Sequence, residues 1–283
     1  MKKLAVVIST ILMSSGAMAY DNYSFTEATY GSDDNTEMVT QVSDGYHGHN
    51  RSTTLFQYNS DDNKVDIFQD GKDNNSLVEV KHSSWNRVDV DQKGQNNDSD
   101  IYLTDYSDGN KVDVKQRGED NESYVKIDDG SDHNDVDVMQ HGHDNDANVK
   151  IDDNAERNDV KIAQRGAWND ADVTIEGGDY NDASIKQDGY GNKGDIDLIG
   201  YDVDHNDARI DQDGNHNTAY INMWSGADNN VADIDQMGDD SHAVINIAYG
   251  SDDNRVYINQ TSNDQAYKNV YGSDGNLFVT NQF

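Results

Sequence analysis

The stretch of residues 110–127, NKVDVKQRGEDNESYVKI, contains the pattern that decides the fold. In its first half the apolar side chains of Val112 and Val114 alternate with charged ones. In its second half, after Gly118, small and apolar side chains alternate with polar ones in the same way. Strict alternation with β-branched residues is typical of a strand that buries one face. We therefore expect two short strands joined by a tight x-Gly-x-x link, where glycine supplies the positive φ that a sharp reversal needs.

The same pattern, N-x-φ-x-φ-x-Q-x-G-x-x-N with φ apolar, recurs through the chain, and its regular copies start 23 to 25 residues apart. The opening asparagines of the regular copies are Asn63, Asn86, Asn110, Asn134, Asn158, Asn181, Asn206, Asn230 and Asn254, and irregular copies start at Asn35 and Asn276. A glutamine follows each after six residues: Gln41, Gln69, Gln92, Gln116, Gln140, Gln164, Gln187, Gln212, Gln236, Gln260 and Gln282. Most copies then carry the link glycine: Gly71, Gly94, Gly118, Gly142, Gly166, Gly189, Gly214 and Gly238. A second asparagine opens the second strand at Asn74, Asn97, Asn121, Asn145, Asn169, Asn192 and Asn217.

Two short strands cannot bury their inner faces alone, but stacked repeats can. We therefore expect an all-β fold: a parallel, in-register β-solenoid with two short strands per repeat of about 24 residues and about ten to eleven turns. The inward asparagines and glutamines from Asn63 to Gln282 would be costly to bury unless they hydrogen-bond along the column as amide ladders. They are the predicted assembly ladder. A disordered Asn- and Asp-rich chain is the alternative, but disorder does not require alternation in register.

Composition excludes several classes of protein. The 283-residue chain has 55 acidic and 21 basic residues, a formal net charge of −34, and no cysteine or proline. Without cysteine there is no disulfide scaffold and no thiolate metal site, and the acidic excess argues against a nucleic-acid partner. Proline would remove a ladder hydrogen bond from a central strand, so its absence fits the solenoid.

Residues 1–19, MKKLAVVISTILMSSGAMA, have the charged start, apolar centre and Ala-x-Ala end of a secretory signal peptide. We expect three parts: the signal peptide at 1–19, a flexible export segment or partial cap at 20–34, and the repeat solenoid at 35–283.

The acidic residues point outward in this arrangement. Stacking predicts two columns of equivalent carboxylates, which would repel and act as gatekeepers against premature assembly. These are Asp66, Asp89, Asp113 and Asp137 in one column, and Asp98, Glu122, Asp146 and Asp170 in the other. Calcium could bridge such carboxylates, but diffuse screening by counter-ions is the favoured alternative. His47/His49 and His141/His143 form two His-Gly-His tripeptides that could chelate a transition metal, but exposed turn histidines are the favoured interpretation. We expect no catalytic site and no cofactor, because no nucleophile, metalloprotease or phosphate-loop motif is present.

The unit N-x5-Q-x-G-x-x-N-x-(A/S) resembles the curlin repeat of bacterial curli subunits, and the resemblance covers residues 35–283. Two features depart from that family: the repeat is about two residues longer, and the second strand ends in an apolar residue where the usual repeat has glutamine. These apolar residues are Val80, Leu103, Ile127, Ile151, Ile175, Leu198, Met223 and Ile247.

The resemblance implies a secreted subunit, more like the major subunit than the nucleator, of an extracellular amyloid fibre that serves biofilm matrix and surface adhesion. It also implies export through the curli outer-membrane channel with a periplasmic chaperone, and a nucleator subunit as partner. The alternative is a soluble acidic β-solenoid that binds cations, a surface or a polymer without polymerising.

Overall fold

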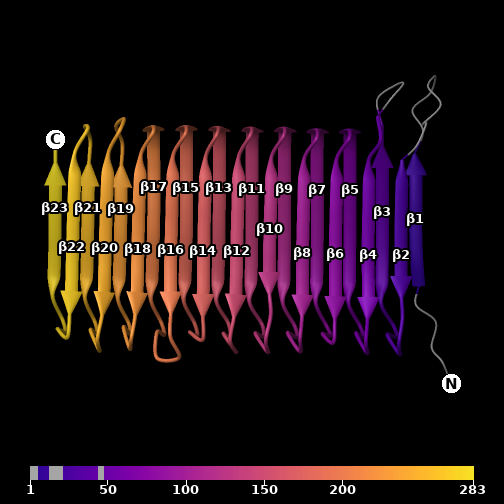
Figure 1. Ribbon diagram of the computed structural model, residues 1–283, viewed down its shortest axis with the longest axis horizontal. Helices are drawn as coiled ribbons and strands as arrows, with labels where there is room; N and C mark the ends of the chain where they lie inside the picture. The colour runs from indigo at the N-terminus through magenta and orange to yellow at the C-terminus, as the bar shows by residue number, and fades with distance from the viewer. Residues whose placement is uncertain (1–5, 13–21, 44–47) are drawn as a thin grey trace.

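The computed structural model describes residues 6–12, 22–43 and 48–283, and its regular elements in these ranges are all β-strands. They form two sheets, one of twelve strands and one of eleven, which we call the first and the second sheet. Odd-numbered strands build the first sheet and even-numbered strands the second. In Figure 1 the strands follow one another along the long axis, and the arrows of the two sheets point in opposite directions. The predicted all-β solenoid is confirmed.

The strands are short and regular in length. The first sheet contains β1 (Val6–Leu12), β3 (Thr36–Val42), β5 (Lys64–Lys72), β7 (Arg87–Gln95), β9 (Lys111–Glu119), β11 (Asp135–His143), β13 (Asp159–Ala167), β15 (Asp182–Tyr190), β17 (Asp207–Asn215), β19 (Val231–Gln236), β21 (Arg255–Gln260) and β23 (Leu277–Gln282). The second sheet contains β2 (Tyr23–Ala28), β4 (Arg51–Gln57), β6 (Asn75–Lys81), β8 (Asp98–Thr104), β10 (Glu122–Ile127), β12 (Asp146–Asp152), β14 (Asp170–Glu176), β16 (Lys193–Ile199), β18 (Thr218–Trp224), β20 (His242–Ala248) and β22 (Gln265–Tyr271).

Every strand pairs in parallel with the strand one repeat away, and equivalent residues face each other. Val112 of β9 lies opposite Val136 of β11, and Gln116 lies opposite Gln140. The same register holds between β10 and β12 in the second sheet. A slip of one residue would turn every inward side chain outward, so the alternation fixes this register.

The core is a thin layer between the two sheets. In the repeat that begins at Asn110, the side chains of Val112, Val114, Val125 and Ile127 are all fully buried. The aliphatic residues that end the second strands are buried as well, from Val80 to Ile247. The sequence thus builds an aliphatic column on one side of the core, beside the amide columns.

The turn between the two strands differs from the expected four-residue link. The first strand continues through it: β9 runs to Glu119 and includes Gly118, which has a φ of 125°. Glycine is required for a second reason, because a Cβ on Gly118 would lie 1.9 Å from the carbonyl oxygen of Gly142 in the next turn. Gly238 does not have the expected positive φ. It also lies outside the strand, because β19 already ends at Gln236.

The N-terminal part contains two strands that the repeat pattern does not predict. Within the expected signal peptide, β1 pairs with β3, while residues 1–5 and 13–21 lie outside the described ranges. Within the segment 20–34, β2 pairs with β4 and starts the second sheet. Among the described residues we find no helix of the length and apolarity needed to cross a bilayer.

Candidate functional site

A continuous ladder of glutamine amides runs through the interior. From Gln41 to Gln282, the Nε2 of each glutamine donates to the Oε1 of the glutamine in the following turn, at 2.8–3.0 Å. The same nitrogen also reaches the second sheet, as where Gln116 donates to the carbonyl oxygen of Asp98 at 2.7 Å. The glutamines therefore connect successive turns and also tie the two sheets together. All donors of this ladder point toward the C-terminus.

The opening asparagines form a second ladder with the opposite direction. Asn158 Nδ2 donates to the Oδ1 of Asn134 in the preceding turn at 3.0 Å, and the backbone N–H of Asn158 donates to the same oxygen at 2.9 Å. Its Nδ2 also donates to the carbonyl oxygen of Gly178 in the following link, at 2.8 Å. Each buried amide is thus satisfied by neighbours above and below, which removes the cost of burying it.

The second asparagines repeat this arrangement at the other end of the core. Asn121 Nδ2 donates to Asn97 Oδ1 at 2.9 Å and to the carbonyl oxygen of Gly142 at 3.1 Å. The sequence pattern missed one member, Asn50, which accepts from Asn74 at 3.0 Å. Asn50 follows Gln41 at the ninth position, whereas Asn74 follows Gln69 at the fifth, and this longer spacing hid it. At the two ends of the predicted ladder, Asn63 is buried, whereas Asn276 and Gln282 are partly exposed.

A ladder of small residues in the inter-repeat links was also missed. Ser83 and Ser107 are fully buried, and the backbone N–H of Ser107 donates to Ser83 Oγ at 3.1 Å. Where serine is replaced, as by Ala155, the side chain is still small and buried. The signal was present in the sequence, because each of these residues stands three positions before an opening asparagine.

The outward acidic columns have the expected register. Asp66, Asp89, Asp113 and Asp137 face one another on successive strands of the first sheet. Asp98, Glu122, Asp146 and Asp170 do so on the second. Lysines interrupt the acidic surface locally: Lys115 Nζ lies 2.7 Å from Asp113 Oδ2.

Several outward carboxyls have raised pKa values. Partial burial is the first cause and neighbouring carboxylates the second. Together they raise the pKa of Asp100 to about 6, beside Asp98 and Glu122. The pKa of Asp195 is also raised to about 6, by partial burial and then by Asp197 and Asp172. The pKa of Asp146 is raised to about 6 as well, by partial burial and then by Glu122 and Asp170.

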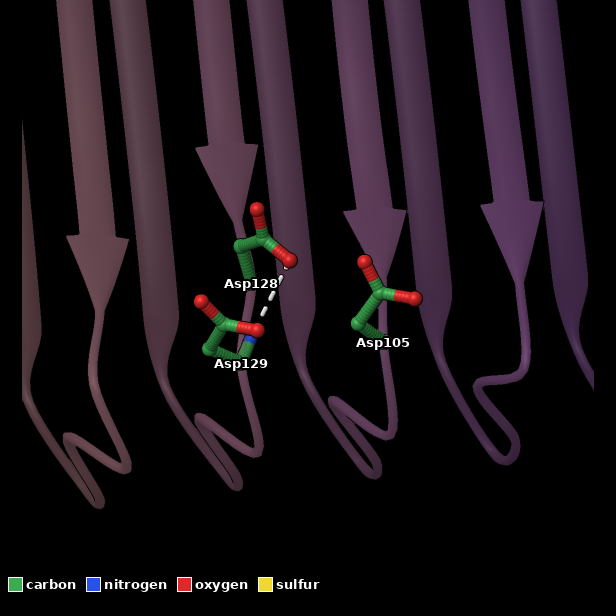
Figure 2. A group of neighbouring side chains, drawn as sticks. All are labelled: Asp105, Asp128 and Asp129. Carbon is green, nitrogen blue, oxygen red and sulfur yellow. Dashed lines mark hydrogen bonds between the residues drawn. The ribbon is translucent and has the colours of Figure 1, made fainter.

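Carboxylates approach within ligating distance of one another in the links rather than in the columns. Asp105, Asp128 and Asp129 lie together at the ends of β8 and β10, as Figure 2 shows, and Asp129 also lies near Asp152 and Asp153. These are the groups of three among the described residues, and neither contains a column carboxylate or a histidine.

Asp128 already has protein partners. Thr104 Oγ1 donates to it at 2.9 Å and the Asp129 N–H at 2.8 Å, and Lys126 forms an ion pair with it. Burial raises its pKa, but these three contacts outweigh burial and lower it.

The structure describes the second His-Gly-His tripeptide in full and the first only in part. His141 and His143 are exposed on β11, whereas His47 lies outside the described ranges.

Two segments of the chain match a known family of repeats. The curlin-associated repeat family matches residues 155–189 and 204–231. The chain contains curlin-associated repeats. The matched curlin repeats include β13, β14, β17 and β18, and the other turns stack on them in the same register. No curated protein matches the chain. Curlin repeats and this solenoid fold are structural rather than enzymatic in kind.

Proposed function

We propose that this chain is a secreted structural subunit that polymerises into extracellular curli-like amyloid fibres, which serve as biofilm matrix and in surface adhesion. The observation that carries the proposal is the Gln ladder. It runs from β3 to β23 and ends at Gln41 and Gln282 with amide groups that can pair again. A column of this kind has no intrinsic length, so a further copy extends it with the bonds that already hold it together.

The edge strands support polymerisation as well. Globular proteins normally cover or charge the edges of their sheets. Here β23 is an edge strand of the first sheet and β22 an edge strand of the second, with no further strand beyond either in the described chain. Figure 1 shows β23 standing alone at the C-terminal end of the row.

The route to the cell surface forms part of the proposal. The signal peptide at residues 1–19 would direct the chain to the periplasm. By resemblance to curli, an outer-membrane channel, a periplasmic chaperone and a nucleator subunit would then deliver it. The acidic surface fits delivery as a soluble chain, because like charges slow self-association until the chain is outside.

The test uses the expected secreted form, residues 20–283, purified under denaturing conditions and diluted into buffer. We expect thioflavin T fluorescence to rise after a lag, unbranched fibres in electron micrographs, and diffraction spacings of about 4.8 and 10 Å. A chain that stays monomeric for days with no thioflavin T signal would refute the fibre function.

The acidic links favour a second candidate, a soluble solenoid that binds cations. Asp105, Asp128 and Asp129 offer oxygen ligands of the kind that Ca²⁺ prefers. This candidate predicts saturable calorimetric binding of Ca²⁺ to a monomer that does not polymerise, whereas the fibre function predicts only diffuse screening. The dilution experiment repeated with and without Ca²⁺ separates the two.

A further inference from the structure

Two charged side chains interrupt the interior columns, one near each end of the stack. Glu37 of β3 is in register with Val65 and is fully buried. Lys268 of β22 is in register with Ile245, and its side chain is half-buried. All other turns between β5 and β21 carry Val or Ala in the column of Glu37. Glu37 therefore occupies a place that β5 to β21 keep apolar, and Lys268 occupies one that β6 to β20 keep apolar.

Neither charge has an ionic partner among the described residues. Thr26 Oγ1 donates to Glu37 Oε2, and Glu37 Oε1 has no hydrogen-bond partner in that part of the chain. Burial raises the pKa of this carboxyl. Lys268 Nζ lies 5.9 Å from the centre of the Phe278 ring. An unpaired charge becomes costly when it is fully buried, as Glu37 is and as Lys268 would be if a further strand covered β22.

The two ends of the stack are complementary in shape. At one end β23 extends the first sheet, but the second sheet already ends at β22. At the other end β2 extends the second sheet by one strand beyond β4. In the structure β1 lies against β3 at this end, and Ile11 is opposite Gln41. Once the signal peptide is removed, β3 is an open edge and β2 is a half-turn that lacks its first-sheet strand.

We propose that a second copy of this chain docks end to end, with β23 and β22 of one copy pairing with β3 and β2 of the next. The strands β23 and β2 then complete one shared turn, and Lys268 forms an ion pair with Glu37 of the next copy. This inference rests on the proposed function and specifies the contact between neighbouring copies, which we call the joint. In repeat register, Phe278 becomes the neighbour of Glu37, and Lys268 becomes the neighbour of Thr26, whose hydroxyl already contacts Glu37.

The amide ladder matches across the same joint. Gln41 Oε1 has no donor among the described residues, and Gln282 Nε2 donates only to the carbonyl oxygen of Gln265, at 3.1 Å. An amide nitrogen carries two hydrogens, so Gln282 has one left for Gln41 of the next copy. Docking of like ends would instead oppose Glu37 to Glu37 or Lys268 to Lys268. The interior charges therefore select the head-to-tail orientation.

The first test reverses each charge in residues 20–283. Glu37→Lys alone and Lys268→Glu alone place like charges in every joint, and we expect each to lengthen the thioflavin T lag by about tenfold or more. In an equimolar mixture every joint between the two different variants is a Lys–Glu joint, so alternating assembly should bring the lag back to within about threefold of the unmodified chain. The control matched to Lys268→Glu is Lys111→Glu, which changes the net charge by the same amount from an exposed site and should keep a nearly normal lag.

The second test does not depend on how the charge variants fold. The chain has no cysteine, and Asn281 and Thr40 fall opposite each other across the joint. Thr40→Cys combined with Asn281→Cys should give disulfide-linked oligomers when fibres are oxidised. Met38→Cys combined with Asn281→Cys, two residues out of register, should not.

The results of these experiments distinguish a failure of the proposed joint from a failure of the proposed function. If the unmodified chain forms no fibres, the proposed function is wrong. If it forms fibres, but the mixture assembles no faster than either variant and the Thr40/Asn281 pair does not crosslink, only the joint is overturned.

Discussion

Gln116 and Gln140 share a side-chain hydrogen bond of 2.9 Å, in which Nε2 of the first donates to Oε1 of the second. Both residues are fully buried. The bond is one rung in a ladder in which each amide needs the one before it and the one after it. Removing a rung therefore leaves the Oε1 of the following glutamine without its donor, while the preceding Nε2 keeps its backbone acceptors.

Gln116→Ala should test this dependence. The substitution leaves Gln140 Oε1 without its donor, whereas Gln92 Nε2 keeps the carbonyl oxygens of Asn75 and Asn97 as acceptors. An unsatisfied buried group of this kind costs about 1–3 kcal/mol. We expect fibres of this variant to dissolve at lower guanidinium concentration and to form more slowly. Lys115→Ala, which alters an outward neighbour on the same strand, is the control. Equal effects of the two substitutions would contradict a structural role for the ladder.

Ile127→Asp tests the aliphatic column. Ile127 lies between Leu103 and Ile151 and is fully buried. An unpaired carboxylate there should cost about 3–5 kcal/mol, whereas Ile127→Val should cost about 1 kcal/mol. Denaturant titration of the fibres measures both variants. Assembly of the aspartate variant at the normal rate would show that this column is not needed for stacking.

Gly118→Ala tests the contact between turns. The added methyl group would lie 1.9 Å from the carbonyl oxygen of Gly142, so two turns must separate. Gly250→Ala is the matched control, since Gly250 also has a positive φ, of 67°, but nothing lies within 4 Å of the added Cβ. The control should lose about 1–2 kcal/mol from backbone strain alone. The Gly118 variant should lose distinctly more, and similar losses would mean that only the backbone conformation matters.

Assembly should accelerate as the pH falls from 7 to 4. The pKa values of Asp100 and Asp195 are raised to about 6 in the folded chain, above the ordinary aspartate value. A raised folded pKa means that stability is fully present below the unfolded value and is lost as the pH rises through the folded value. Thioflavin T kinetics at a series of pH values measure this effect.

The gatekeeper columns give the matching control for the pH series. A variant in which Asp66, Asp89, Asp113 and Asp137 are changed to asparagine should assemble faster at pH 7 and respond less to added salt or Ca²⁺. If rates are indifferent to pH, salt and Ca²⁺ alike, the acidic surface does not restrain assembly.

The alternation and the Asn and Gln positions were sufficient to predict the fold, because a strand with a period of two has only one register that buries its apolar face. The path of the turn was less predictable. Gly118 is needed for its distance to Gly142, a contact between repeats that one repeat read alone does not reveal. The strand β2 was missed because it has no Asn/Gln pair, and its pairing depends on β4. Glu37 and Lys268 follow no repeat pattern, so only the structure showed that they point into the core.

The ladders in this chain do not all point the same way. Glutamine side chains donate toward the C-terminus, while both sets of asparagines donate toward the N-terminus. In an α-helix, aligned peptide dipoles add up and leave partial charges at the two ends. Here the amide dipoles of one column oppose those of its neighbours, so their sum grows more slowly as turns are added. The stack can thus become long without a matching increase in side-chain dipole potential at its tips.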